Sequence, residues 1–484
     1  MNMTQSQWSA AEFGDAHFVD RRLRTRLIHL TGCFAACPAT SLPNACGSTA
    51  ASKAAYRYFG NARVSPATIL APHIRRTAER VEALDATAAC VLVAQDTTSL
   101  AFTKQGVRGL GYLERAGRRG IFLHTALAIS TDGDVLGQLA QRQWVRDDED
   151  YGKTARRKST PSQQKESDIW RQLRDEARQA LGESVQMISL MDREADIFTL
   201  LAAPRPSNTD YIIRVAQKHR RVRTANPSLA QSTGDKMLTS GRLIDLLEAA
   251  APAAESMRVE VGRKKERLPR SATLSVRFLE VVIPPPQRRP SGTAACAPVT
   301  VRVILVREEQ PPPGEEPIEW VLVTTLPVGS FEQARACVAY YCKRWLIERF
   351  HYTLKSGLQI EELQLESRAS LSNAIATLSI VAWHLMQLLY HARVHPDTSC
   401  AQSLEPSQWK ALVLRQQRGT HAVLPTEPPS MKQAMLWIAQ LGGYRGRAAK
   451  DVPGLKTLWR GLRRLADMTE TYNDMHRLLT ASRS

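Results

Sequence analysis

Three acidic residues, far apart in the chain, occupy positions from which they could bind the same metal ions. Asp96 ends the apolar run CVLVAQD, Asp192 ends the similar run QMISLMD, and Glu348 is the one acid in the basic segment YYCKRWLIERFHYTLK. Converging carboxylates repel one another unless a cation lies between them, and oxygen-rich sites of this kind suit Mg²⁺ or Mn²⁺. Two such ions about 3.5 to 4 Å apart can support an in-line displacement at phosphorus. These residues therefore predict phosphoryl transfer with two Mg²⁺ ions, for which Mn²⁺ could substitute.

The segment around Glu348 is predicted to be an amphipathic helix. At about 100° per residue, one face spanning roughly 60° carries Tyr341, Arg344, Glu348 and Lys355. The opposite face is apolar and suited to a core, with Ile347, Phe350 and Leu354. A solvated surface with salt bridges is the alternative, since Arg344 and Glu348 stand at the stabilising i, i+4 spacing. Taken alone, this helix would favour the solvated surface.

The net charge indicates a polyanionic partner. The 484 residues include 65 Lys and Arg against 47 Asp and Glu, which gives a formal charge of +18. Nucleic acid is the first candidate for the partner. A membrane surface is the alternative, but we find neither an apolar run of about 18 residues nor a lipidation signal. A glycoside hydrolase also uses paired carboxylates, yet it gains nothing from this much positive charge.

The cysteines and the first residues predict a cytoplasmic protein. The start, MNMTQSQWSAAEFGD, lacks the charged and apolar regions of a secretory signal. The 8 cysteines are scattered, without the paired C-x2-C spacing that suggests a zinc site. We expect free thiols in a reducing cytoplasm.

The order of the elements predicts an α/β multi-domain protein with a ribonuclease-H-like mixed-sheet core. Three strands in a meander come first, and a helix, the strand QMISLMD, a second helix, the strand EWVLVTT and the helix of Glu348 follow. Such a succession gives a mixed sheet flanked by helices. In the ribonuclease-H-like fold the first and fourth strands are neighbours. Asp96 and Asp192 would therefore meet, and the last helix could bring Glu348 to them.

Three motifs resemble those of the DDE cut-and-paste transposases of bacteria. They are QDTTSL at 95–100, DREADI at 192–197, and the pattern Y-x2-R-x3-E-x6-K that begins at Tyr341. The match is to the transposon-five-like branch of the insertion-sequence-four family. AAYRYFGNARVS resembles the end-binding domain of that family, and LGGYRG with LKTLWRGLRRL resembles its dimerising helices. The resemblance is weak across 225–317 and 395–430.

The resemblance implies a role for each matching residue. Asp96, Asp192 and Glu348 match the catalytic, metal-binding triad. The residues that match DNA contacts, or lie in the basic cluster KHRRVRT, are Tyr341, Arg344, Lys355, Trp320, Arg214, Lys218 and Arg220. Among them, Trp320 matches an aromatic that stacks on a flipped base, with a core tryptophan as the alternative, and Arg214 is otherwise a surface arginine. Arg193 and Glu194 stay open, because the first turn of a helix is polar by default.

The resemblance also implies the activity and the partners. Such an enzyme binds the terminal inverted repeats of a transposon, cuts both strands through a hairpin intermediate and joins the ends to target DNA. It works as a homodimer on double-stranded DNA and, in a bacterium, is associated with the nucleoid. A stand-alone ribonuclease-H-like nuclease and a catalytically silent, domesticated DNA-binding protein are the alternatives.

Five segments are predicted. They are a helical DNA-end-binding domain (1–80), the first part of the ribonuclease-H-like catalytic core (81–216), a β-rich insertion subdomain (217–317), the second part of the core (318–394) and a helical dimerisation domain (395–484). For residues 1–80, a simple helical bundle is the alternative to DNA binding.

Overall fold

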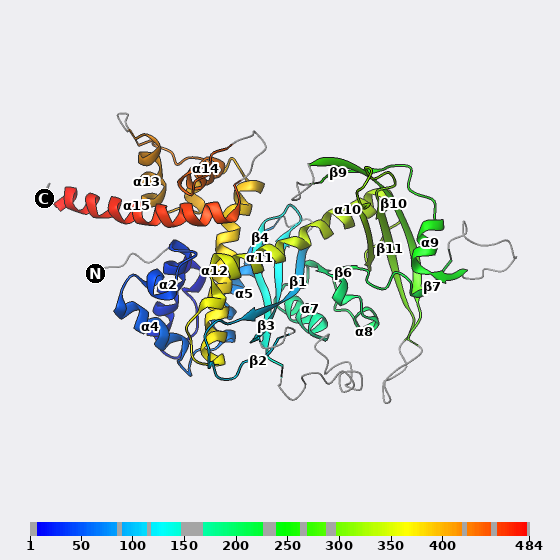
Figure 1. Cartoon of the computed structure of the whole chain (residues 1–484), viewed down its shortest axis with the longest axis horizontal. Helices are drawn as coiled ribbons and strands as arrows, with labels where there is room; N and C mark the ends of the chain where they lie inside the picture. Colours follow the sequence, from blue (N-terminus) through cyan, green and yellow to red (C-terminus); the bar gives the residue numbers. More distant parts are fainter. Residues whose placement is uncertain are drawn as a thin grey trace.

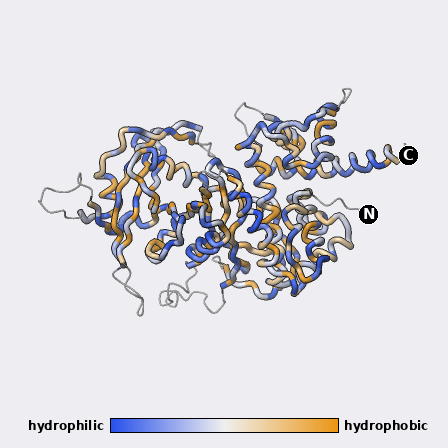
Figure 2. Tube along the Cα trace, turned by 180° about the vertical axis from the view of Figure 1, so that it is seen from behind, coloured by the Kyte–Doolittle hydropathy of each residue, from blue (hydrophilic) through white to orange (hydrophobic). Residues whose placement is uncertain are grey.

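The computed structural model describes residues 7–84, 90–113, 118–146, 168–225, 239–261, 269–286, 297–418, 424–446 and 453–481. The N-terminal and C-terminal helices lie at one end of the molecule, and the strands of the inserted region lie at the other (Figure 1). Figure 2 shows hydrophobic segments concentrated in the strands of the sheet and in the helices packed beside them.

A mixed sheet forms the core. Its first part contains β1 (Cys90–Ala101), β2 (Gly111–Tyr112), β3 (Arg119–Ser130), β4 (Val135–Trp144), β5 (Gln186–Met191) and β6 (Thr209–Arg214). Strand β3 pairs antiparallel with β1, β2 and β4, whereas β5 is parallel to both β1 and β6. The predicted ribonuclease-H-like arrangement is confirmed, because the first strand and the strand before Asp192 are direct neighbours.

The inserted strands extend this same sheet. Outward from β6 follow β12 (Glu319–Thr324), β11 (Val299–Arg307), β10 (Arg270–Ile283), β7 (Arg221–Thr224) and β8 (Thr239–Arg242), and β9 (Met257–Val261) pairs with β10. The insertion is β-rich, as predicted. It does not form a sheet of its own, because backbone pairing between β6 and β12 joins it to the core.

The fifth core strand differs from the prediction. We expected EWVLVTT in this position, but the fifth strand is β6, which is parallel to β5. The chain leaves β6, builds the inserted strands and returns as β12, which runs antiparallel to β6. The helical segment with Glu348 follows β12, as predicted.

That helical segment is irregular. Helix α10 (Phe331–Cys342) continues through the 3-10 turn η6 (Lys343–Trp345) into α11 (Leu346–Tyr352) and the π-helical turn η7 (Thr353–Gly357). A short 3-10 turn, η8 (Ile360–Glu362), comes next. A uniform 100° per residue is therefore wrong for this run. Its predicted apolar face is nevertheless fully buried, with Ile347, Phe350 and Leu354.

Helices cover the sheet and form the N-terminal region. α7 (Ile169–Gln179) packs on β3 and β4, and α9 (Leu243–Ala249) packs on β8 and β10.

The N-terminal helices are α1 (Gln7–Phe13), α2 (Arg21–Ala36), α3 (Leu42–Cys46), α4 (Thr49–Phe59) and α5 (Pro66–Glu82). Side chains of Asp20, Ser48 and Ser65 cap α2, α4 and α5 by accepting backbone N–H groups. Helix α5 crosses the predicted border at residue 80 and packs on β4.

Helix α12 (Arg368–Val394) runs through the centre of the molecule. It contacts α2, α4 and α5 of the N-terminal region, β4 of the sheet, and the C-terminal helix α14 (Met431–Leu441). By length and composition it could cross a membrane, which corrects our expectation that the chain holds no such run. However, 83% of its most apolar window is buried inside the protein, as in the core helix of a folded domain.

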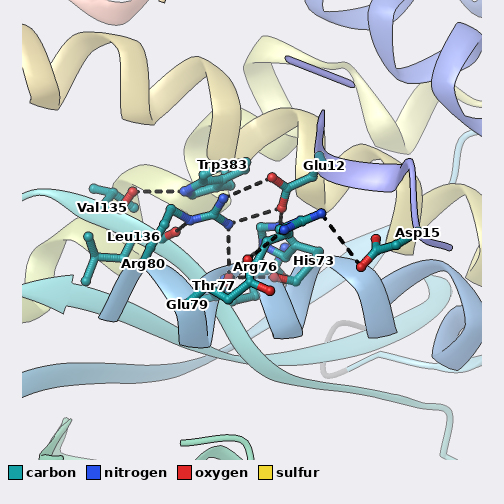
Figure 3. A network of polar contacts seen from close by, with 11 residues as sticks. Glu12, Asp15, His73, Arg76, Thr77, Glu79, Arg80, Val135, Leu136 and Trp383 are labelled. Atoms are coloured by element: carbon teal, nitrogen blue, oxygen red, sulfur yellow. Dashed lines mark hydrogen bonds and ion pairs between the residues drawn. The ribbon is translucent and has the colours of Figure 1, made fainter. Parts of the chain in front are cut away.

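A buried polar network joins the N-terminal region to α12 and the sheet (Figure 3). Glu12 of α1 accepts hydrogen bonds from Arg80 and His73 of α5, and Arg80 also stacks over the ring of Trp383. The Nε2 atom of His73 accepts the backbone N–H of Gln138 at 3.0 Å, which places the imidazole proton on Nδ1. Burial alone would raise the pKa of Glu12, but His73 and Arg80 hold it down to about 2. The carboxylate is therefore ionised and fully satisfied.

The C-terminal region consists of η9 (Cys400–Gln402), α13 (Pro406–Gln416), α14 and α15 (Leu455–Ala481) within the described residues. Glycines let α14 and α15 approach closely: a Cβ on Gly442 or Gly461 would lie 1.8 Å from a backbone oxygen of the opposite segment. The far half of α15 projects away from the rest of the molecule (Figure 1) and exposes Met475 and Leu478.

Candidate active site

Asp96 and Asp192 lie side by side on neighbouring strands. β1 and β5 pair in parallel immediately before the two aspartates, which occupy equivalent positions in the register. Asp192 caps the 3-10 turn η4 (Arg193–Ala195), because its Oδ1 accepts the backbone N–H of Glu194 at 2.8 Å. We had predicted that Asp96 ends its strand, but it does not. β1 stays paired with β3 as far as Ala101, so that Asp96 lies within the strand.

Glu348 lies in the first turn of α11 and interacts electrostatically with Asp96. Burial raises the pKa of Asp96 to about 7, with further contributions from the charges of Asp192 and Glu348, while Arg344 opposes the rise. Like charges shift a pKa in this way when they are a few ångströms apart. The topology thus brings together three acids that are distant in the sequence.

The three carboxylates do not yet converge on one point. Glu348 forms an ion pair with Arg344, and its side chain is 52% exposed. Within the described ranges, the one group of three side chains with all ligand atoms within 4.8 Å of one another is Asp134, His391 and His395. The acid triad is therefore more open than that group. In the structure, the Glu348 carboxylate faces Arg344.

His351 contacts the triad and was missed in the sequence. Its Nδ1 lies 3.7 Å from Oδ2 of Asp96. Burial lowers the pKa of His351 to about 3, so the ring is neutral at physiological pH. On the other side, the backbone N–H of Thr97 donates to Oδ1 of Asp96 at 2.9 Å. The available signal was the spacing, since His351 follows Glu348 by one helical turn on the same face.

Three arginines lie near the acids. The pKa of Arg214, at the end of β6, is lowered first by burial and next by the charge of Arg193, with a further contribution from Arg344. Asp192 acts on Arg214 in the opposite direction. Arg193 and Arg344 thus both lie close enough to Arg214 to act on its charge, as does Asp192. Arg193, which the sequence left open, belongs to this group.

Trp320 and Tyr341 form an aromatic pair next to these arginines. Their ring centroids lie 6.2 Å apart in an edge-to-face arrangement, and the guanidinium of Arg344 lies 6.0 Å from the ring centroid of Tyr341. Tyr341 is buried, with 6% of its surface exposed. Trp320 is only partly buried, at the start of β12, and packs on the main core. Part of the Trp320 ring is therefore exposed, as stacking on a base requires, and the rest packs like a core residue.

The two cations predicted from KHRRVRT have partners within the protein. Lys218 forms an ion pair with Glu319, the residue before Trp320. Arg220 forms an ion pair with Asp196, whose carboxylate is fully buried, and the arginine side chain itself is only 10% exposed. The structure therefore argues against Arg220 as a DNA contact, because its guanidinium neutralises a buried charge.

Lys355 lies in the π-helical turn η7 and is half-buried. Burial lowers its pKa, although Glu361 acts in the opposite direction. Its charge also lowers the pKa of His351, the residue that contacts Asp96. Lys355 thus lies near His351, the residue that contacts Asp96.

Three family models match the chain. "Transposase DNA-binding" covers residues 5–64, "Transposase DDE domain" covers residues 132–383, and "Transposase Tn5 dimerisation domain" covers residues 380–477. The DDE model alone spans more than half of the chain, so the protein belongs to the DDE transposase family. Its combination of domains is that of the Tn5-like members, as predicted from the motifs.

A solved structure described as "Cryo-EM structure of piggyBac transposase synaptic complex with hairpin DNA" is also similar to this chain. The sequence identity is 9% and the TM-score is 0.28, over 79% of this chain and 57% of the other. At this TM-score the two molecules cannot be compared element by element.

A divalent metal is implied by the family, and the acids fit one. Asp96, Asp192 and Glu348 offer only oxygen donors, which hard cations prefer. Asp96 is buried beside the like charges of Asp192 and Glu348, and all three effects raise its pKa. A bound cation would remove this repulsion and favour the ionised carboxylates.

Proposed function

We propose that this protein is a transposase of the transposon-five-like branch of the insertion-sequence-four family, with the signature Tyr341, Arg344, Glu348 and Lys355. It binds the terminal inverted repeats of its element, cleaves DNA there and transfers the freed strands into target DNA. The observation that supports this proposal best is the electrostatic coupling of Asp96 to two acids distant in the sequence, Asp192 and Glu348, near a group of arginines.

Asp96, Asp192 and Glu348 would hold the metal ions, with Mg²⁺ as the physiological ion and Mn²⁺ as a substitute. Two such ions activate the attacking oxygen and stabilise the leaving oxygen in a displacement at phosphorus. His351 stays neutral beside Asp96, so it adds no charge that would compete with a cation. The chain contributes position and charge, which is most of what phosphoryl transfer requires.

Arg344 has a part in both the resting and the loaded site. It pairs with Glu348 and lowers the pKa of Asp96, and thus serves as the internal counter-ion of the acids. With the carboxylates neutralised, Arg344 would be available to bind a DNA phosphate together with Arg193 and Arg214. A phosphate anion would offset the repulsion that Arg193 and Arg344 exert on Arg214.

Trp320 would stack on a base flipped out at the end of the element, as hairpin formation requires. Its partly exposed ring is fixed on one edge by Tyr341, which leaves a flat apolar surface near the arginines. Base stacking on an aromatic ring contributes about 1–3 kcal/mol per base. Lys218 would contribute to DNA binding from the neighbouring turn, once it leaves Glu319.

The N-terminal region would bind DNA, and the C-terminal region would contact the second subunit. The N-terminal helices match a DNA-binding family, and the projecting half of α15 exposes apolar residues such as Met475 and Leu478. We expect a homodimer on double-stranded DNA in the bacterial cytoplasm, associated with the nucleoid. In such a dimer each subunit binds one end of the element and cleaves the other.

A cleavage assay tests the proposal. The substrate is a labelled duplex with the inverted repeat that flanks the coding region, incubated with the purified full-length protein and Mg²⁺, Mn²⁺ or Ca²⁺. We expect nicking at the repeat, a hairpin product and then joined products with Mg²⁺ or Mn²⁺. Cleavage without preference for the repeat would support a stand-alone nuclease instead. Specific binding without any cleavage would support the silent DNA-binding protein.

A further inference from the structure

Two histidines and an aspartate form a cluster outside the acid triad. The cluster lies where the turn between β3 and β4 meets the C-terminal end of α12. The Nε2 atom of His395 lies 2.6 Å from Oδ2 of Asp134, and Nδ1 of His391 lies 3.4 Å from Oδ1 of the same carboxylate. One potential ligand atom from each residue lies within 4.8 Å of the other two.

The backbone fixes all three side chains. His391 and His395 are separated by one helical turn, so they project from the same face, and their ring centroids lie 4.7 Å apart. The N–H of His395 donates to the carbonyl of His391 at 2.7 Å and ends the helix. In the opposing turn, the hydroxyl of Ser130 accepts the backbone N–H of Asp134 at 3.0 Å. The site is thus organised before any ligand arrives.

We propose that Asp134, His391 and His395 form a binding site for Zn²⁺. Imidazole nitrogens combined with a single carboxylate suit zinc and related transition metals, whereas Mg²⁺ and Ca²⁺ prefer oxygen ligands. Three protein ligands leave one coordination position for water. His395 is 42% exposed and lines an open groove of about 660 Å³, so an ion can reach the site from solvent.

Without a metal, the same groups form a hydrogen-bonded ion pair. Hydrogen bonds from His391 and His395 outweigh the burial that would raise the pKa of Asp134, and the bond to Asp134 raises the pKa of His391. A simple ion pair needs one histidine. Here two histidines from one turn of a helix lie beside the same carboxylate, so three potential ligand atoms are gathered in one place.

The site would join two parts of the molecule that the family models separate. Asp134 belongs to the hairpin of β3, which pairs with the strand of Asp96, whereas both histidines lie in the segment matched as the dimerisation domain. A bound Zn²⁺ ion would therefore hold the catalytic sheet to the start of that domain. Because the folded state alone presents the site, zinc should raise the melting temperature.

Metal titration of the full-length protein tests the proposal. Protein freed of metal by chelator is titrated with Zn²⁺ by calorimetry, and with Co²⁺ as a coloured probe, in excess Mg²⁺ to occupy the acid triad. We expect one equivalent of Zn²⁺ per chain and Co²⁺ absorption bands typical of a low-coordinate nitrogen–oxygen site. His391→Ala and Asp134→Asn should each weaken binding by about 100-fold or more.

The controls separate this site from the catalytic one. His17→Asn removes an exposed histidine of the N-terminal region and should leave Zn²⁺ binding unchanged. Asp96→Asn should also keep the zinc equivalent, whatever its effect on DNA cleavage. Wild-type protein that takes up no zinc equivalent, or that shows only the weak Co²⁺ spectrum of the free ion, would overturn the proposal, as would a His391→Ala variant with wild-type affinity.

Discussion

Two buried charged clusters of this molecule differ in whether they are complete. At the junction of α1, α5 and α12, the carboxylate of Glu12 has His73 and Arg80 as partners, and its pKa is about 2. Within the central strand β1, Asp96 has other carboxylates nearby, and its pKa is about 7. Burial acts in the same direction on both acids. The partners decide the outcome, because cations offset the burial of Glu12 whereas like charges add to the effect of burial on Asp96.

The largest effect is expected from changing an acid of the incomplete cluster. Glu348→Gln should lower the rate of DNA cleavage by at least about 1,000-fold, because metal-ion charge stabilisation contributes several kcal/mol. DNA-end binding, measured by gel shift in Ca²⁺, should change little. Glu332→Gln is a matched control, an exposed acid in the first turn of α10. Equal cleavage rates for both variants would show that Glu348 is not part of the site.

Changing Glu12 in the complete cluster should lower the stability of the protein rather than its catalytic activity. Glu12→Gln leaves Arg80 without its buried partner, which should lower the free energy of unfolding by about 3–5 kcal/mol at neutral pH. The pKa of Glu12 is depressed in the folded state, so its contribution is present above the ordinary value of 4.5 and is lost as the pH falls toward about 2. Urea titrations at pH 7 and pH 3 should show the difference from wild type shrinking at the lower pH.

The exposed ion pair of Glu79 with Arg76 supplies the control for that experiment, since the Glu79 side chain is 54% exposed. Glu79→Gln should change stability by less than about 1 kcal/mol at either pH. If Glu12→Gln behaves like Glu79→Gln, the junction does not hold the N-terminal region in place.

The sequence predicted the strands that carry Asp96 and Asp192 because long apolar runs report burial directly. It also placed Glu348 on a helix after EWVLVTT. The sequence did not predict that β12 returns antiparallel to β6, because strand pairing depends on contacts between residues more than 100 positions apart, such as Leu322 with Arg214. Local patterns carry no information on such pairs.

The sequence also did not predict which partner each individual side chain would have. KHRRVRT predicted exposed cations, yet Arg220 is paired with the buried Asp196, and nothing in the local sequence distinguishes it from a solvated arginine. His351 was overlooked because a lone histidine in a basic helix has many roles. Asp134, His391 and His395 could not be grouped, since the turn and the helix meet only in the folded molecule.

Neutralising Asp96 should raise the free energy of unfolding, whereas neutralising Glu12 should lower it. In the metal-free protein, Asp96→Asn should raise the free energy of unfolding by about 1–2 kcal/mol at pH 8. The folded-state pKa of about 7 lies above the ordinary value of 3.8, so the cost of ionising Asp96 grows as the pH rises between these values. The gain should be absent at pH 4. A loss of stability at pH 8 would mean that Asp96 has favourable partners in the fold.

The smallest effect concerns two arginines in different settings. Arg344→Ala should weaken DNA binding and reduce the slope of log K against log salt by about 0.9, as expected for one lost phosphate contact. Arg220→Ala should leave that slope unchanged and instead lower the stability, because it strands the buried carboxylate of Asp196. Fluorescence anisotropy at four or more salt concentrations measures both slopes. A changed slope for Arg220→Ala would return it to the DNA-binding surface.

Helix α12 has a consequence for the geometry of the whole subunit. It is about 40 Å long at 1.5 Å per residue, and it packs against the N-terminal helices, the catalytic sheet and α14 along its length. A turn of the N-terminal region relative to the sheet would therefore break contacts along this one rod. In the proposed dimer, the distance between the DNA end bound by the N-terminal region and the neighbouring subunit would thus be set within each chain, before two chains meet.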